Sequence, residues 1–264
     1  MVAVMGSAGS VRQRLLVSLT GLFALFQARD ALAAVWRPCW IDHGAVLAPA
    51  TFGDMVGDVV LDPGRSQSAL HDTAARSAGL TGGAVTAAWS LAGQTARSVT
   101  LPIRDLDPET RDLEVSAIGV VGADLLAGQV VTLDLRRGCR MSLDRNARSL
   151  ARRSRAVALV GLNGGWAITA RITDGVTVQS GLFRIDGDRS ETTVVGGRLS
   201  RTAQDGDPVR LRAVEAAGVF LEQAPARIIA AAEGQKPGLG TSLWRGGVLV
   251  LDTIAQRLTF QPAR

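Results

Sequence analysis

The sequence predicts an all-β protein built from two similar halves. Short apolar segments rich in β-branched residues alternate with Gly and Asp turns. One short stretch, residues 73–80, favours a helix. Two blocks of sequence occur twice, in the same order, and self-similarity of this kind indicates a repeated structural unit. Together these observations favour two compact β lobes over one large β domain.

The chain begins with a segment typical of export. Arg12 and Arg14 precede an apolar run over residues 15–26, and small residues at 31–33 form a cleavage signal before Ala34. The run is shorter than the roughly 20 apolar residues that span a bilayer, so no stable membrane anchor is expected. We predict a signal peptide over residues 1–33 and a periplasmic or secreted mature protein.

Charge and aromatic content argue against nucleic acid as a partner. The chain has a formal charge of +5, and the leader carries three Arg and one Asp, which leaves +5 − 2 = +3 on the mature chain. This charge is mild, and the chain has no Tyr and only 4% aromatic residues to stack on bases.

The cysteines and histidines suggest a disulfide and no metal. An oxidising compartment favours a bond between Cys39 and Cys139, the alternative being two free buried thiols. Two distant cysteines with His43 and His71 give no metal-ligand spacing, so no metal or cofactor is expected.

The internal repeat organises the chain. Residues 60–70 (VLDPGRSQSAL) align without a gap with 184–194 (RIDGDRSETTV), and residues 122–134 (GADLLAGQVVTLD) align with 240–252 (GTSLWRGGVLVLD). The offset is 124 in the first block and 118 in the second, so the second half is six residues shorter between the blocks, as an insertion at a loop tip would produce.

The repeat predicts the domain boundaries. An N-terminal lobe is expected over residues 34–148 and a C-terminal lobe over 149–264, with a linker at 149–160 that continues the Arg-rich run of 145–155. The strands predicted with most support are 46–51, 58–61, 139–143, 167–173, 176–185 and 257–260.

The repeated blocks resemble a known family. A strand that ends in two hydrophobic residues and Asp, followed by a tight turn and Ser, and later the segment 118–126 (IGVVGADLL), are similar to retropepsin-like and pepsin-like aspartic peptidases, whose motif is Asp-Thr/Ser-Gly. The resemblance covers nearly the whole mature chain. It implies a bilobal, pepsin-like architecture of two retropepsin-like β-barrel units with a cleft between them.

The resemblance also implies site residues. Asp62 and Asp186 would form a catalytic pair at the cleft floor, where two carboxylates about 3 Å apart share one proton. Hairpins near Ala92-Gly93 and Asp205-Gly206 would cover the cleft as flaps, and Trp89 would either line the cleft or pack in the core. The loops around the two aspartates would be formed by Pro63, Gly64, Arg65 and Ser66 in one lobe and by Gly187, Asp188, Arg189 and Ser190 in the other.

Both loops depart from the family motif in ways that oppose catalysis. Pro63 and Gly187 stand where the family has the hydroxyl that ties the loops together, and Asp188 stands in place of a glycine. Arg65 and Arg189 occupy positions of small residues.

The arginines allow two arrangements. Within about 4–6 Å of a carboxylate, a guanidinium lowers its pKa by about 1–3 units, so cross-lobe ion pairs of Asp62 with Arg189, and of Arg65 with Asp186 or Asp188, would oppose proton sharing. Outward-pointing, solvated arginines are the alternative.

Two functions follow, with a third as a weaker possibility. The first is a pseudo-peptidase that binds an extended peptide or protein segment in the cleft. The second is an active aspartic endopeptidase, in which the Asp62/Asp186 pair activates water and which has an acid optimum. The third is an unrelated β-sandwich. A monomer is expected, because one chain supplies both lobes.

Overall fold

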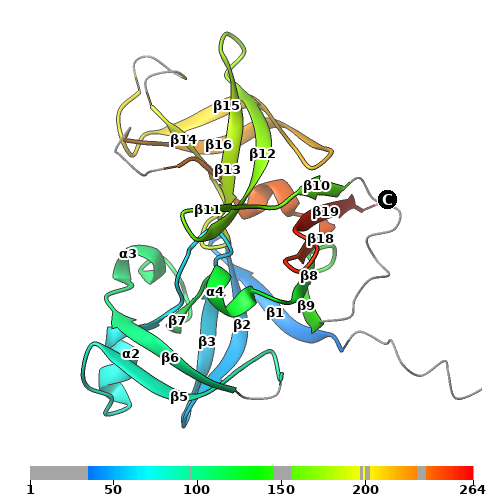
Figure 1. Cartoon of the computed structure of the whole chain (residues 1–264). Helices are drawn as coiled ribbons and strands as arrows, with labels where there is room; N and C mark the ends of the chain where they lie inside the picture. The colour runs from blue at the N-terminus through cyan, green and yellow to red at the C-terminus, as the bar shows by residue number, and fades with distance from the viewer. Residues whose placement is uncertain are drawn as a thin grey trace, which may run out of the picture. The chain divides into compact units, whose positions relative to one another are not determined.

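The computed structural model describes residues 35–94, 97–144, 156–196, 199, 203–230 and 236–263. Strands dominate this part of the chain (Figure 1). Both the predicted signal peptide and the Arg-rich run at 145–155 lie outside it. No helix among these residues is long and apolar enough to cross a membrane.

Six strands of the N-terminal half close into a barrel. Their order is β2-β3-β7-β4-β6-β5, and pairing of β5 with β2 closes the ring. Alternate apolar side chains point inward, so Phe52, Leu61 and Leu70 are fully buried. The strands are β2 (Ala45–Phe52), β3 (Met55–Leu61), β4 (Ala69–His71), β5 (Ala84–Leu91), β6 (Arg97–Arg104) and β7 (Ala117–Val121).

Six strands of the C-terminal half form a second barrel in the corresponding order. The order is β12-β13-β17-β14-β16-β15, closed by the pairing of β15 with β12, and β11 (Val160–Leu162) adds to the outside of β12. The strands are β12 (Gly165–Thr173), β13 (Val178–Ile185), β14 (Thr192–Val195), β15 (Pro208–Ala216), β16 (Val219–Ile229) and β17 (Gly238–Leu239).

Six further strands form an antiparallel sheet to which both halves contribute. Its order is β10-β19-β18-β8-β9-β1, and β1 continues from this sheet into the first barrel. The strands are β1 (Arg37–Asp42), β8 (Val130–Asp134), β9 (Cys139–Asp144), β10 (Ala156–Ala158), β18 (Gly247–Asp252) and β19 (Arg257–Pro262).

The register at the middle of this sheet matches the sequence repeat. In the β8–β18 pair, Thr132 lies opposite Val250. The offset of the second repeated block, 118, relates the same two residues, since 132 + 118 = 250. Asp134 and Val130 lie opposite Val248 and Asp252, so the pairing is symmetric about its centre.

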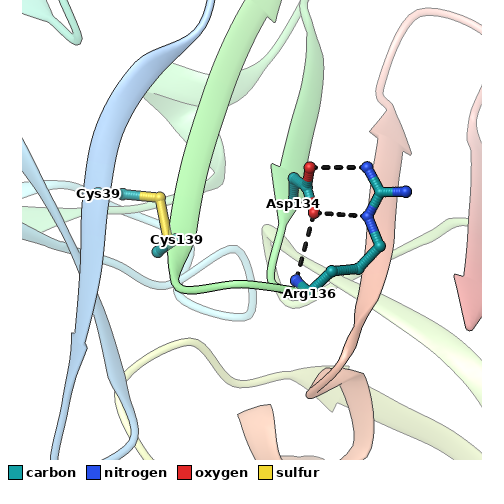
Figure 2. The surroundings of a disulfide bond; sticks show 4 residues. All are labelled: Cys39, Asp134, Arg136 and Cys139. Carbon is teal, nitrogen blue, oxygen red and sulfur yellow. Dashed lines mark hydrogen bonds and ion pairs between the residues drawn. A yellow bond between two sulfur atoms is a disulfide. The ribbon is translucent and has the colours of Figure 1, made fainter. Parts of the chain in front are cut away.

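Cys39 and Cys139 form a disulfide, as predicted. They lie opposite one another in the β1–β9 pair, with their Cα atoms 4.9 Å apart (Figure 2). At the nearby end of β8, the Asp134 side chain is 3% exposed and forms ion pairs with Arg136 at 2.8 Å and Arg140 at 2.7 Å.

The helices are short and sit in the connections between strands. The predicted helix at 73–80 is observed as α2 (Asp72–Ser77), which ends before Gly79, a residue with φ of 73°. In the described part of the chain, the other helical elements are α3 (Asp107–Thr110), α4 (Ala123–Leu126) and the 3₁₀ helix η2 (Thr241–Trp244).

The predicted linker at 149–160 extends too far. Residues 156–158 form β10 and pair with the edge of β19, and Val160 begins β11. The Ala-Val-Ala segment at 156–158 forms a strand. It was assigned to the linker because the Arg-rich run directly precedes it.

Candidate functional site

Equivalent backbone bonds position the two aspartates. Asp62 follows β3 and donates its N–H to the carbonyl of Val121 at 2.9 Å, and Asp186 follows β13 and donates to Leu239 at 3.1 Å. The acceptors are related by the repeat offset, since 121 + 118 = 239, as the donors are, since 62 + 124 = 186. Each aspartate is therefore fixed in the same way to a strand of its own barrel.

The loops that carry the aspartates contact each other through backbone groups. Trp166 donates its N–H to Pro63 and Val46 donates to Gly187, both at 2.8 Å. Gly64 also donates to Ile185 at 2.9 Å. These bonds join the two halves where the family would use Thr or Ser hydroxyls.

Glycine is required for this close approach. A Cβ at residue 187 would overlap the carbonyl oxygen of Leu61, and a Cβ at Gly165 would overlap that of Gly64. Neither Gly64 nor Asp188 has a positive φ. Asp188, which stands in place of a glycine, therefore needs no glycine-only backbone conformation, and Gly64 is constrained by packing against Asp186.

Asp62 accepts hydrogen bonds from both halves. Its Oδ1 receives the N–H groups of Gly64 and Gly187, each at 3.2 Å. Burial raises the pKa of Asp62 well above its usual value, and the carboxylates of Asp188 and Asp186 add to this effect. The Gly187 N–H and Arg184 oppose the rise without cancelling it.

Asp186 has a different environment, because its polar contacts come from its own barrel. Its Oδ1 lies 3.5 Å from Nε of Arg184, and its Oδ2 accepts a long bond of 3.5 Å from Thr193. The carboxyl packs against Gly238, where a Cβ would overlap it. The residue is 2% exposed, and burial raises the pKa of Asp186 to about 6 despite the nearby Arg184.

Sequence reasoning missed Arg184, Thr193 and Gly238. A signal for Arg184 was present, because Arg184 lies in β13 two positions before Asp186, and alternate residues of an extended chain point to the same side. Thr193 and Gly238 reach the carboxyl from β14 and β17, and local sequence does not reveal those pairings.

Neither of the two arrangements that the sequence allowed for the arginines is observed as such, because each arginine pairs within its own lobe. Arg65 pairs with Glu109 of α3 at 2.7 Å, within its own lobe. Arg189 binds its neighbour Asp188 with both Nε and Nη2, at 2.9 and 2.6 Å. Each arginine thus has a carboxylate partner in its own half.

The serines of the two loops lie at the junction of the halves. Ser66 packs against Gly164, and Ser190 packs against Gly44. Both glycines belong to the turn that precedes the long hairpin of the opposite half. The two contacts correspond to each other across the repeat.

The first hairpin does not occupy the predicted flap position. Ala92 and Gly93 do form the turn between β5 and β6, but Gly93 lies against Arg37 of β1. Gln94 donates to Gln129 at 2.8 Å and to the carbonyl of Leu143 at 3.2 Å. The turn therefore packs on the six-stranded sheet shared by the halves.

The structure places Trp89 and the turn at Asp205-Gly206, the other residues predicted for the flaps, in different surroundings. Trp89 is 5% exposed and packs in the core of the first barrel. Asp205 and Gly206 form a turn that leads into β15, and Gly206 accepts a hydrogen bond from Arg227 at 2.8 Å. Most of the chain just before this turn, including residues 200–202, lies outside the described residues, so a flap there stays a prediction.

A pocket of about 490 Å³ lies between residues of the two halves. We call it the interlobe pocket. It borders Asp188 and Arg189 of the second Asp loop, whereas Asp62 and Asp186 are buried and do not line it. Its lining residues are His43, Pro108, Glu109, Asp112 and Leu113 from the first half and Asp188, Arg189, Ser190, Glu191, Thr193 and Arg227 from the second.

Comparison with known proteins identifies the fold. Neither protein-family models nor curated proteins give a match to the sequence. Among solved structures, the chain is similar to the aspartic proteinase from Irpex lacteus, with a TM-score of 0.55 and 12% sequence identity over 88% of this chain and 98% of that one. With its two closed barrels, the chain has the bilobal fold of pepsin-like aspartic proteinases.

Proposed function

We propose that this chain is an exported peptide-binding protein, a pseudo-peptidase with an aspartic-peptidase fold that arose by internal duplication. The observation that carries the proposal is the asymmetry of the aspartates. Asp62 accepts backbone N–H groups from both halves, Gly64 and Gly187. The polar contacts of Asp186, by contrast, are Arg184 and Thr193 of its own barrel, and Gly64 of the other half packs against its Oδ1 without a hydrogen bond to it. Catalysis by this fold needs two carboxyls that face one water and share a proton.

The interlobe pocket supports binding of a segment with a basic residue. Its four carboxylates outnumber its two guanidinium groups. Glu109, Asp188 and Glu191 already pair with arginines. Asp112 has no ion pair among the described residues, which leaves negative charge for a cationic side chain or a peptide amino terminus.

A binding experiment tests the proposal. Peptide arrays probed with the purified protein should show capture of extended peptides that contain Arg or Lys, and no cleavage between pH 3 and 9. Because one exposed charge pair contributes up to about 1 kcal/mol, Asp112→Asn should weaken capture by up to roughly fivefold. Asp54→Asn, an exposed change in the turn after β2, is the matched control and should have no effect.

The active endopeptidase remains the second candidate, because burial raises the pKa of both aspartates, the direction that retention of a shared proton requires. With the pKa of Asp186 at about 6, activity would rise through that pH rather than peak in acid. Peptide cleavage that Asp62→Asn abolishes would overturn the pseudo-peptidase proposal and establish this candidate.

A further inference from the structure

Three potential metal ligands converge beside the interlobe pocket. Asp42 ends β1, His43 follows it in the turn to β2, and Glu114 lies in the connection between α3 and β7. One ligand atom from each residue lies within 4.8 Å of the others. The expectation of no metal-ligand cluster considered only cysteine and histidine spacing, and here the fold supplies Glu114 from 72 positions after Asp42.

The Asp42 carboxylate is buried and held in a fixed orientation. Its side chain is 7% exposed, and Oδ2 accepts the N–H groups of Glu114 at 2.7 Å and Val115 at 3.1 Å. These bonds leave Oδ1 directed toward His43. Outer hydrogen bonds that orient a carboxylate in this way are typical of metal sites.

The three ligand atoms lie slightly farther apart than around a shared cation, all within 4.8 Å of one another. Nε2 of His43 lies 3.5 Å from Oε1 of Glu114 and 3.9 Å from Oδ1 of Asp42. Ligands at about 2.0–2.2 Å from a tetrahedral Zn²⁺ lie about 3.3–3.6 Å from each other. A small inward movement of the exposed Glu114 and His43 side chains would complete the geometry.

The cluster also has space on its outer side. A cavity of about 380 Å³ borders all three residues together with Trp40, Ile41 and Val115. This space can hold the water that completes a four-coordinate site. One imidazole with two carboxylates is a donor set that suits zinc better than the all-oxygen cations Mg²⁺ and Ca²⁺.

We propose that Asp42, His43 and Glu114 bind one divalent transition-metal ion, with Zn²⁺ preferred. The site lies next to a contact between the halves, because the carbonyl of Gly44 accepts the hydroxyl of Thr241 at 2.6 Å. His43 also lines the interlobe pocket. A bound ion therefore stiffens the turn at which the two halves meet, and it adds positive charge at the pocket edge.

Competition with a chromogenic chelator, on the purified full-length protein, measures the site directly. We expect one Zn²⁺ per chain and weaker binding of Ca²⁺ and Mg²⁺. Glu114→Gln and His43→Asn should each lower the Zn²⁺ affinity by about tenfold or more, because each change removes a metal ligand, and even loss of a group that only orients a ligand lowers affinity by that much. Asn tolerates the left-handed backbone at residue 43, where φ is 46°.

A Co²⁺ absorption spectrum and a control variant distinguish binding at these three residues from non-specific metal binding. Co²⁺ in place of Zn²⁺ should give the visible absorption of a tetrahedral site, lost in Glu114→Gln. Glu222→Gln, the same change at an exposed residue of β16, should leave binding unchanged. Equal Zn²⁺ affinity in all variants, no binding to the folded wild-type protein, or preferential binding of Ca²⁺ would each overturn the proposal.

Discussion

At the scale of residues, the two aspartates occupy equivalent backbone positions but have different side-chain environments. Asp62 and Asp186 make the same backbone bond in their own barrels. Their side chains nevertheless differ, because Asp62 receives N–H donors whereas Asp186 faces a guanidinium 3.5 Å away and has no close donor on Oδ1. Equivalent places in a repeat therefore do not give equivalent chemistry.

The pKa of Asp186 makes the stability of the protein depend on pH. Its folded pKa is about 6 and its ordinary value 3.8, so the folded state holds a proton that the unfolded state releases between these values. This contribution to stability is therefore fully present below about pH 4 and is lost as pH rises through 6, by an amount on the order of 3 kcal/mol. The raised pKa of Asp62 acts in the same direction.

Asp186→Asn tests this dependence. The amide imitates the protonated acid, so the variant should match the wild type near pH 4 and be more stable by roughly 3 kcal/mol at pH 7.5. Urea unfolding at both pH values measures the difference. Asp54→Asn should leave the pH profile unchanged, and a wild-type protein that becomes more stable from pH 4 to 7 would contradict the prediction.

The equivalence of Asp62 and Asp186 could be predicted from sequence, because hydrophobic pairs precede both and the blocks align, and their backbone bonds are equivalent. The partners of Arg65 and Arg189 could not be found in this way. Glu109 lies 44 positions from Arg65, and the choice between a cross-lobe partner and Asp188 depends on the local path of the Arg189 side chain.

At the scale of elements, the sequence position of a hairpin turn was easier to predict than the surface against which the turn packs. The turn at Ala92-Gly93 was predicted at the right place, but its packing on Arg37 and Gln129 depends on how β5 and β6 lie in the barrel. Turn residues fix where a chain reverses. They carry no information on which end of the barrel the reversal occupies.

The disulfide joins two neighbouring strands of the shared sheet. It closes a loop over a sequence separation of 100 that includes the whole first barrel. Removing it with Cys39→Ser and Cys139→Ser together should lower the free energy of unfolding by up to about 4 kcal/mol, because the unfolded chain gains freedom. Guanidinium unfolding of the double variant measures the loss.

Reduction of the wild-type protein provides the comparison. It should lower the unfolding midpoint to that of the double variant, while a reductant should not affect the variant itself. An unchanged midpoint after complete reduction, verified by thiol titration, would mean that strand pairing alone holds β1 to β9.

At the scale of the whole molecule, the repeat and the register agree. The symmetric pairing of β8 with β18 and the reciprocal contacts of Pro63 and Gly187 place equivalent residues in equivalent bonds. The two-lobed β fold was predictable because the repeat was visible. The shared six-stranded sheet was not, because a strand sequence does not reveal a partner in the other half.

The two halves are joined most closely where Gly187 meets Leu61. In Gly187→Ala, the new Cβ would overlap the Leu61 carbonyl oxygen and force the Asp loops apart. The Gly187 N–H would then leave Asp62, so we expect a loss of about 3 kcal/mol in unfolding free energy, at the upper end for an overpacked site. Gly181→Ala in β13 is the matched control, because nothing lies within 4 Å of a Cβ there. Thermal and urea unfolding of both variants measure the effect, and equal stability of the two would show that the loops can separate without weakening the junction of the halves.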